Sequence, residues 1–318
     1  MSSPFVTIGV PVYKGQEFLV ETLLSIQAQT YKNIDVIISL DGPDSVCEEL
    51  CQPFLKGSRF HLVVQPKQLG WVKHINWLIS QVKTPYWYCH PQDDLVTPDY
   101  VQVLLSAAEK MPKAAVVYCD IKTFGDKKRK ITRPSVTGSP VIRQLQLLLI
   151  HQAAVAFRGL TRIEALHNTG EFRANEVDNY SSDTVWLAGM ARWGNLQRIP
   201  KVMYYKRYHS NNEHTKWATW PKEKISKAWV IHCVDMLEQA MLINTNRFEK
   251  GLLWLATIIR LYNKSFGYFS IAKFTFVDRI KLFEDLLYYA SSRGNIEIPN
   301  GLIKLKDFIY KIQSIKSS

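Results

Sequence analysis

The sequence lacks an apolar run long enough to cross a lipid bilayer. The longest largely apolar stretch, Gly251–Ile259, ends at Arg260, whereas a membrane-spanning helix needs about 20 such residues. The start of the chain, Met1–Thr7, also lacks the basic and apolar regions of a signal peptide. We therefore expect a cytoplasmic location, with association at the cytoplasmic face of a membrane as the alternative.

Cysteine is scarce, and glycine-rich phosphate-binding loops are missing. The chain has 5 cysteines and no C-x-x-C pair, which argues against a disulfide framework or a zinc site and favours a reducing compartment. Neither G-x-G-x-x-G nor a Walker loop occurs, and Val12–Gln16 contains only Gly15. A nucleotidyltransferase usually has such a loop near its first strand, so the missing loop argues against that class of enzyme, which we keep only as an alternative.

Positive charge is in excess. The chain has 40 basic and 28 acidic residues, a formal net charge of +12, and 47% of its residues are hydrophobic. It can therefore bury a core, and its charge favours an anionic partner: nucleotide phosphates, nucleic acid or a membrane surface. Since no known nucleic-acid motif occurs, we expect no nucleic-acid partner and rank a noncatalytic basic binding module last. We interpret the basic run Asp126–Lys130 as a solvated turn.

Short β-branched runs alternate with helical patterns along the first part of the chain. We predict strands at Phe5–Val12, Ile34–Leu40, His61–Gln65 and Tyr86–His90, and helices at Glu17–Gln29, Glu48–Phe54, Gly70–Val82 and Tyr100–Lys110. This alternation is typical of an α/β fold with a doubly wound, mainly parallel sheet.

The remaining chain is predicted to be mixed and then helical. We expect strands at Ala114–Phe124, Ala153–Phe157 and Arg198–Arg207, and helices at Val141–Ile150, Thr161–His167, Asp183–Trp193, Lys222–Leu242, Arg247–Leu261, Phe276–Ser291 and Leu302–Ile312. The composition shifts near Lys216. We therefore predict a catalytic domain over residues 1–215, with a nucleotide half at 1–97 and an acceptor half at 98–215, followed by a helical region over 216–318.

Polar side chains follow three of the predicted strands. Tyr13, Asp41 and Asp93 each come just after a strand of the first half. In open α/β sheets, ligands bind beyond the carboxyl ends of the strands. Asp93 and Asp94 also supply the hard oxygen ligands that Mg²⁺ and Mn²⁺ prefer. The segment Tyr86–Asp99 is therefore the expected centre of the functional site.

Taken in order, these motifs resemble family 2 glycosyltransferases of the GT-A fold. The resemblance covers roughly residues 5–214 and rests on Val10-Pro11-Val12-Tyr13, Asp41-Gly42, Gln68-Leu69-Gly70 with Asn76, Gln92-Asp93-Asp94 with Pro98, Ser182-Asp183, Gly194, Pro200 and Arg207-Tyr208-His209. It implies an inverting sugar transfer from a nucleoside-diphosphate sugar, first of all a UDP-sugar. The acceptor would be a hydroxyl of a carbohydrate or lipid-linked molecule in polysaccharide, O-antigen or other glycoconjugate synthesis.

The resemblance also implies a divalent cation, Mn²⁺ or Mg²⁺, at Asp93. Such a cation offsets the charge that develops on the leaving diphosphate. The commoner family pattern has an acid two residues earlier, where this chain has Pro91. We therefore expect help from Asp94 or from His209, which follows a late strand. The alternatives are that the aspartates cap the next helix and that His209 is a surface residue.

Donor binding is assigned mainly to the nucleotide half. Asp41 is expected to bind the base or ribose of the nucleoside, unless it serves only as a turn former before Gly42. Pro11, Val12 and Tyr13 are expected to supply backbone contacts and a stacking ring. Gly70 is expected to let the backbone approach the ligand closely at the start of a helix, and Lys73 to contact a phosphate. Gln92, beside the aspartates, is also expected to bind the nucleotide sugar. Tyr13 could equally be a packing residue. Arg207 and His214 are alternates for contacting the diphosphate.

Asp183 is the expected general base on the acceptor side. It matches the second acid of the family's acidic pair, whereas the first is replaced by Ser182. The alternative is that Asp183 is a helix N-cap, with Asp178 or Glu176 as the base. The helices of residues 216–318 are expected to pack on the catalytic domain, or to make peripheral membrane contact through the aromatic and basic segment Gly251–Lys273.

Overall fold

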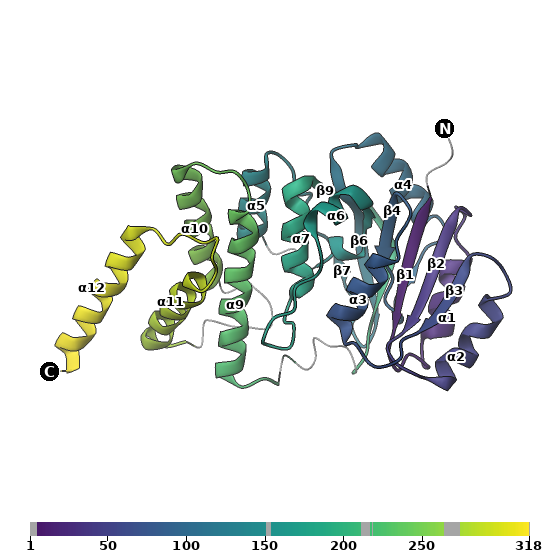
Figure 1. The fold of residues 1–318 in the computed structure, drawn as a ribbon, viewed down its shortest axis with the longest axis horizontal. Coiled ribbons are helices and arrows are strands. Elements are labelled where there is room, and N and C mark those ends of the chain that lie inside the picture. The colour runs from purple at the N-terminus through teal and green to yellow at the C-terminus, as the bar shows by residue number, and fades with distance from the viewer. Residues whose placement is uncertain (1–4, 151–153, 211–216, 218, 264–273, 318) are drawn as a thin grey trace.

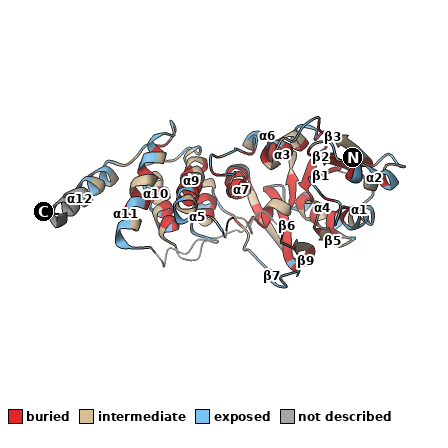
Figure 2. Cartoon of the chain, turned by 90° about the horizontal axis from the view of Figure 1, so that it is seen from below, coloured by how far each residue is buried: buried red, intermediate tan, exposed pale blue. Residues whose placement is uncertain are grey.

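The computed structural model describes residues 5–150, 154–210, 217, 219–263 and 274–317. These residues form one mixed sheet with helices on both faces and a series of helices that extends to one side (Figures 1 and 2). Buried residues concentrate in the sheet and on the helix faces that cover it (Figure 2).

The first half of the sheet is parallel, which confirms the predicted alternation. Strands β1 and β2 pair in parallel, as do β1 with β4 and β2 with β3. Strands β1, β2 and β4 are almost entirely buried because their residues are mostly apolar on both faces, whereas the edge strand β3 is buried only at Phe60. The elements are β1 (Val6–Val12), α1 (Leu19–Gln27), β2 (Ile34–Leu40), α2 (Ser45–Cys51), η1 (Gln52–Phe54), β3 (Phe60–Val64), α3 (Trp71–Ser80) and β4 (Tyr86–Cys89).

The second half adds antiparallel pairs to the sheet. Its elements are β5 (Leu95–Val96), α4 (Tyr100–Lys110), β6 (Ala114–Gly125), β7 (Lys130–Ile131), α5 (Pro140–Leu149), η2 (Ala156–Arg158), β8 (Leu160–Arg162), α6 (Ile163–Thr169), α7 (Ser182–Trp193) and β9 (Asn195–Tyr208). The sheet order is β3-β2-β1-β4-β8-β6-β9-β5, with β7 on β6. Strand β8 joins the two halves by pairing antiparallel to both β4 and β6.

The predicted strand at Ala153–Phe157 is wrong for the residues that the structure describes there, which form a turn and η2. The strand begins at Leu160 instead, directly after Gly159. A methyl group on Gly159 would lie 2.6 Å from the carbonyl oxygen of Val117, so the close approach of the two backbones requires glycine. The helix predicted from Thr161 starts at Ile163, because Thr161 pairs with β4 and β6.

The C-terminal helices pack on the sheet domain through α5 and α7. They are α9 (Lys222–Met241), α10 (Arg247–Tyr262), α11 (Phe276–Ser291) and α12 (Asn300–Ser317). Helix α9 contacts α7, α10 contacts α5, and α11 contacts α9, whereas α12 extends away from the body (Figure 1). Within the described ranges, every helix is too short or too polar to span a bilayer.

Candidate active site

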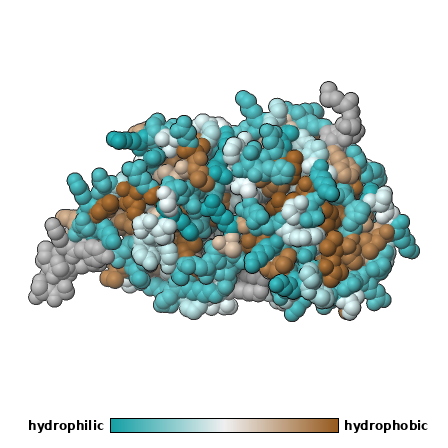
Figure 3. Space-filling model, viewed as in Figure 1, coloured by the Kyte–Doolittle hydropathy of each residue, from teal (hydrophilic) through white to brown (hydrophobic). Residues whose placement is uncertain are grey.

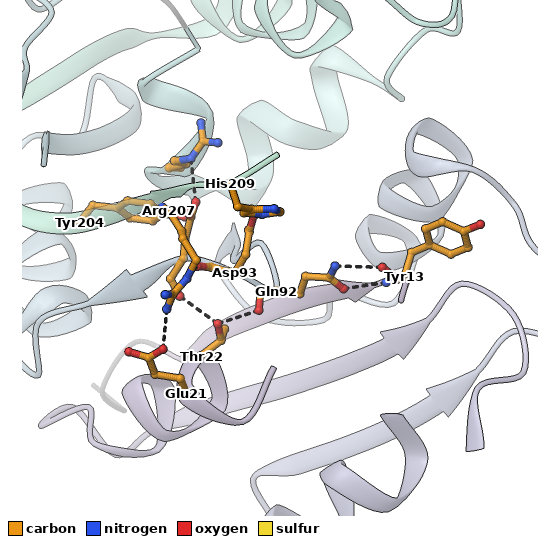
Figure 4. Close-up of polar contacts among 10 residues, drawn as sticks. Tyr13, Glu21, Thr22, Gln92, Asp93, Tyr204, Arg207 and His209 are labelled. Atoms are coloured by element: carbon orange, nitrogen blue, oxygen red, sulfur yellow. Dashed lines mark hydrogen bonds and ion pairs between the residues drawn. The ribbon is translucent and has the colours of Figure 1, made fainter. Parts of the chain in front are cut away.

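A side-chain amide joins the loops that follow β1 and β4. Gln92 accepts a hydrogen bond from the backbone N–H of Tyr13 at 2.7 Å and donates one to the Tyr13 carbonyl at 2.9 Å (Figure 4). A methyl group on Gly15 would lie 2.6 Å from the Gln92 side-chain oxygen, so glycine leaves room for this amide. The two bonds fix the backbone after β1 and leave the Tyr13 ring 46% exposed.

Asp94 is buried and holds β9 against the loop after β4. Its Oδ2 accepts a hydrogen bond from the hydroxyl of Tyr204 at 2.7 Å, and its Oδ1 accepts one from the backbone N–H of Arg207 at 2.8 Å. The Nε of Arg158 lies 3.3 Å from Oδ2 and completes the pairing. Since protein donors engage both oxygens, the geometry favours a positioning role for Asp94 over the predicted metal role.

Asp93 turns the other way and meets His209. The Nε2 of His209 lies 2.8 Å from Oδ2 of Asp93, and the side chains are 21% and 18% exposed (Figure 4). Burial raises the pKa of Asp93, the adjacent charge of Asp94 raises it further, and His209 opposes both effects. The structure therefore brings together two of the three residues that the sequence proposed as ligands, Asp93 and His209. Position 91, where an acid is commoner in the pattern that the sequence resembles, is Pro91 and adds no carboxylate to the pair.

Three cations surround these carboxylates. Arg207 donates from Nε to the backbone carbonyl of Asp93 at 3.0 Å, and its guanidinium reaches Glu21 on α1 (Figure 4). Burial lowers the pKa of Arg158, but nearby anionic groups outweigh it, so the net shift is upward. Burial, and then the charge of Arg158, lower the pKa of Lys206 to about 8. Such a concentration of positive charge suits a polyanionic ligand.

Asp183 lies in the first turn of α7, within electrostatic range of the same cations. The N-cap of α7 is Ser181, so Asp183 is not the cap that the alternative reading required. Its Oδ1 accepts the backbone N–H of Thr184 at 2.8 Å. Burial raises the pKa of Asp183, and the charges of Arg158 and Lys206 oppose that rise. Asp183 and the carboxylates after β4 therefore have two neighbouring cations in common, Arg158 and Lys206.

The predicted nucleoside residue anchors a loop. Asp41 is buried, and its two oxygens accept hydrogen bonds from the backbone N–H groups of Leu69 and Gly70 at 2.6 and 3.1 Å. The loop enters α3 at Gly70 with φ of +79°, a conformation that glycine adopts without strain. Lys73 is exposed in the first turn of α3.

The remaining predicted donor contacts lie at the end of β1. Pro11 is half-buried, Val12 is buried, and the carbonyl of Val12 accepts the N–H of Asp41 at 2.7 Å. The alternate His214 lies outside the described residues. The structure thus places the donor-side residues around the ends of β1, β2 and β4, as the parallel strand order requires.

The sequence did not identify Arg158, Lys206 and Tyr204 as site residues. Arg158 came within a predicted turn, where nothing distinguished it from other surface arginines. Tyr204 and Lys206 gave a weak signal, because residues two apart on a strand share a face and both belong to the aromatic and basic run before His209. Only the pairing of β9 with β6 shows that this run returns to the loop after β4.

Sequence comparison places this arrangement in a known family. The sequence profile described as glycosyl transferase family 2 matches residues 7–168, about half of the chain. The chain belongs to glycosyl transferase family 2. An uncharacterized glycosyltransferase of Rickettsia typhi is 28% identical over 130 residues, which are 41% of this chain and 40% of that relative. The match therefore spans less than half of the relative's length.

Solved structures agree on the GT-A fold. S. aureus TarS in complex with UDP-GlcNAc superposes with a TM-score of 0.66 at 13% identity, over 94% of this chain and 82% of that one. A mannosyltransferase of Pyrobaculum calidifontis, in complex with GDP-Man and Mn²⁺, superposes with a TM-score of 0.55 at 14% identity, over 97% and 81% of the two chains. The predicted fold class is confirmed.

Proposed function

We propose that this family 2 member transfers a sugar from a nucleoside-diphosphate sugar to an acceptor hydroxyl, with inversion at the transferred carbon. The observation that carries the proposal is the shared set of cations. Arg158 and Lys206 lie within electrostatic range of both Asp94, beside the donor-side loops, and Asp183 on the acceptor side. A diphosphate leaving group and an attacking hydroxyl need such groups at one place.

On the donor side, the nucleotide lies over the ends of β1, β2 and β4. The exposed ring of Tyr13 stacks on the base, and the backbone of Pro11 and Val12 lines the site. Asp41 acts by holding the Leu69–Gly70 loop and offers its remaining lone pairs to the nucleoside. Gln92 fixes Tyr13, and Lys73 faces the phosphates. A UDP-sugar is the first choice, because UDP-GlcNAc is bound to TarS, which shares the fold.

A divalent cation fits the pair formed by Asp93 and His209. Carboxylate oxygen and imidazole nitrogen both suit Mn²⁺, and Asp93 and His209 lie within 2.8 Å of each other, so these two residues would hold the ion. Among the described residues, no three His, Cys, Asp or Glu side chains gather as a metal cage, so a cation held by this pair would need further ligands from outside the protein. When bound, the cation offsets the charge of the leaving diphosphate.

The protein's own residues perform the remaining steps. The hydroxyl oxygen of the acceptor attacks the sugar carbon, and the bond from that carbon to the diphosphate breaks. Asp183 accepts the proton that the hydroxyl releases. Burial raises the pKa of Asp183, which makes the carboxylate a stronger base than a solvated aspartate. Lys206 and Arg207 lie beside the departing diphosphate and stabilise its charge. Asp94 keeps β9, and with it these cations, in place.

The acceptor and the location of the enzyme are further parts of the proposal. We assign the enzyme a carbohydrate or lipid-linked acceptor, glycoconjugate or polysaccharide synthesis, a cytoplasmic location, and a catalytic domain over 1–215 followed by the helical region 216–318.

Peripheral membrane contact is supported by the hydrophobic surface, brown in Figure 3, over the C-terminal helices. Exposed apolar residues there are Phe248, Leu255 and Ile259 on α10 and Phe276, Val277 and Tyr288 on α11. Residues 264–273 of the predicted membrane segment lie outside the described residues.

A panel of sugar nucleotides tests the function. We expect one donor, with Mn²⁺, to raise the melting temperature and to be hydrolysed slowly without acceptor. Asp93→Ala should abolish both effects, whereas Asp99→Ala should retain them, because Asp99 pairs with Lys201 away from the site. Absence of a shift with every nucleoside diphosphate would contradict the proposal.

A further inference from the structure

The basic turn between β6 and β7 has a backbone that hydrogen bonds hold in place. Its side chains, from Lys127 to Lys130, are exposed, as expected of a solvated turn, but its backbone is anchored. The buried hydroxyl of Thr123 donates to the carbonyl of Lys127 at 2.7 Å and accepts the N–H of Arg129 at 2.8 Å. Figure 2 shows β7 projecting from the body beside β9.

The turn packs on the end of β9. The N–H of Asp126 donates to the carbonyl of Tyr208 at 2.9 Å, and a methyl group on Gly125 would clash with the same oxygen. Gly125 also has φ of +80°, so both its conformation and its contact favour glycine. The turn is therefore held at a fixed place next to the last residues of β9.

Three cations gather around the Tyr208 ring. The Nζ of Lys127, the guanidinium carbon of Arg129 and the Nζ of Lys206 lie 5.7, 5.7 and 5.1 Å from its centroid. Arg129 also donates to the Tyr208 hydroxyl at 3.1 Å. We call Lys127, Arg129 and Lys206 the rim cluster.

The neighbouring residue Lys130 has a carboxylate partner, whereas the rim cluster has none among the described residues. Lys130 pairs with the buried carboxylate of Asp120 at 3.2 Å. In the part of the chain that the structure describes, no ion pair joins a member of the rim cluster to a carboxylate within 4.0 Å. Three cations held close together repel one another, so an anion bound among them relieves that repulsion.

Lys206 connects the rim cluster to the reacting groups. It lies within electrostatic range of Asp93, Asp94 and Asp183, while its ammonium group lies over Tyr208. The other two members, Lys127 and Arg129, are exposed on the β6–β7 turn. An anion held by them therefore lies next to Lys206, at the edge of the site.

We propose that Lys127 and Arg129 of the rim cluster bind phosphate groups of the acceptor, so that this enzyme glycosylates a phosphate-bearing molecule. The inference rests on the proposed glycosyltransferase function and specifies its acceptor class. Arginine binds phosphate through paired N–H donors, and lysine acts as a point charge. A phosphodiester-linked chain presents such charges at intervals and can reach from the turn to Lys206.

Binding of linear inorganic polyphosphate tests the proposal without requiring transfer. We expect the full-length protein, with excess UDP at the donor site, to bind polyphosphate and not neutral dextran. The double variant K127A/R129A should bind it about tenfold more weakly. The control K56A/K83A removes two exposed lysines elsewhere and should bind as the wild type does. Equal affinity of K127A/R129A and wild type would overturn the proposal.

Two further measurements keep the result interpretable. The single variant K127Q retains the Arg129–Tyr208 bond and should still lose part of the affinity if the double variant folds poorly. Vesicles of phosphatidylcholine with phosphatidylglycerol form a separate arm. Loss of vesicle binding by K127A/R129A with unchanged polyphosphate binding would identify a membrane contact and overturn the acceptor assignment. Donor hydrolysis by the wild type is measured alongside, so failure of the proposed function appears there independently.

Discussion

The imidazole Nε2 of His209 lies 2.8 Å from Oδ2 of Asp93, although 116 positions separate the two residues. Asp94, the immediate neighbour of Asp93, points its carboxylate to Tyr204 and the backbone of Arg207 instead. Two adjacent aspartates therefore have different tasks. Asp93 contacts His209, and Asp94 is part of the framework that holds β9, and with it His209, against the loop after β4.

The first prediction concerns His209. H209A should weaken Mn²⁺ binding at least about tenfold, because one of two protein ligands is lost. Titration of Mn²⁺ followed by electron paramagnetic resonance measures the free ion directly. H167A removes an exposed histidine on α6 and should bind Mn²⁺ as the wild type does. An unchanged Mn²⁺ affinity in H209A would exclude His209 as a ligand.

The second prediction concerns the framework at Asp94. Y204F leaves a buried carboxylate oxygen without its hydroxyl donor, so the free energy of unfolding should fall by about 1–3 kcal/mol. Urea denaturation measures the loss. Y205F, the adjacent and less buried tyrosine, should change it by less than about 0.5 kcal/mol. Equal stabilities of the two variants would show that the bond to Asp94 contributes nothing.

The third prediction concerns Asp183 and pH. A carboxyl group whose pKa is raised by folding binds its proton more tightly in the folded state, so it stabilises the fold less as pH rises from its ordinary pKa through the raised value. Burial raises the pKa of Asp183. D183N should therefore melt at a higher temperature than the wild type at pH 7.5, with the gap closing toward pH 4.

Activity measurements distinguish Asp183 from Asp178, the alternative candidate for the general base. D183N should lower the transfer rate by about 10²–10⁴-fold, as loss of a general base does. D178N should keep the rate, because Asp178 is exposed and pairs with Lys224 on α9. A larger loss in D178N than in D183N would reverse the assignment of the base.

The fourth prediction concerns Lys206. Its pKa is lowered to about 8, so it loses its positive charge as pH rises through that value. The affinity of the wild type for UDP should therefore decline above pH 8, and K206M should show weak affinity without that decline. K201M is the matched control, because Lys201 lies on the same strand and pairs with Asp99. Isothermal titration calorimetry across pH 6.5–9.5 measures both; a K206M curve that follows the wild type would refute the assignment.

Much of the fold follows from local pattern. Buried β-branched runs and helical spacing predicted the parallel half of the sheet nearly to the residue, because both depend on neighbours in sequence. The stretch before Arg158 was predicted wrongly as a strand, because its backbone is placed by contacts with β6 that local pattern does not encode. Strand β8, only three residues long, is likewise decided by pairing with β4 and β6.

For the site, the sequence by itself determined that polar residues follow the strands, since the carboxyl ends of parallel strands share one edge of the sheet. It thereby placed Tyr13, Asp41 and Asp93 together and proposed His209 and Asp183 as partners. Only the tertiary structure decided which aspartate meets His209, and that Arg158 and Lys206 lie within electrostatic range of both Asp94 and Asp183. The physical reason is that hydrogen bonds and charge act through space: the donor to Asp94, Tyr204, lies 110 positions away along the chain.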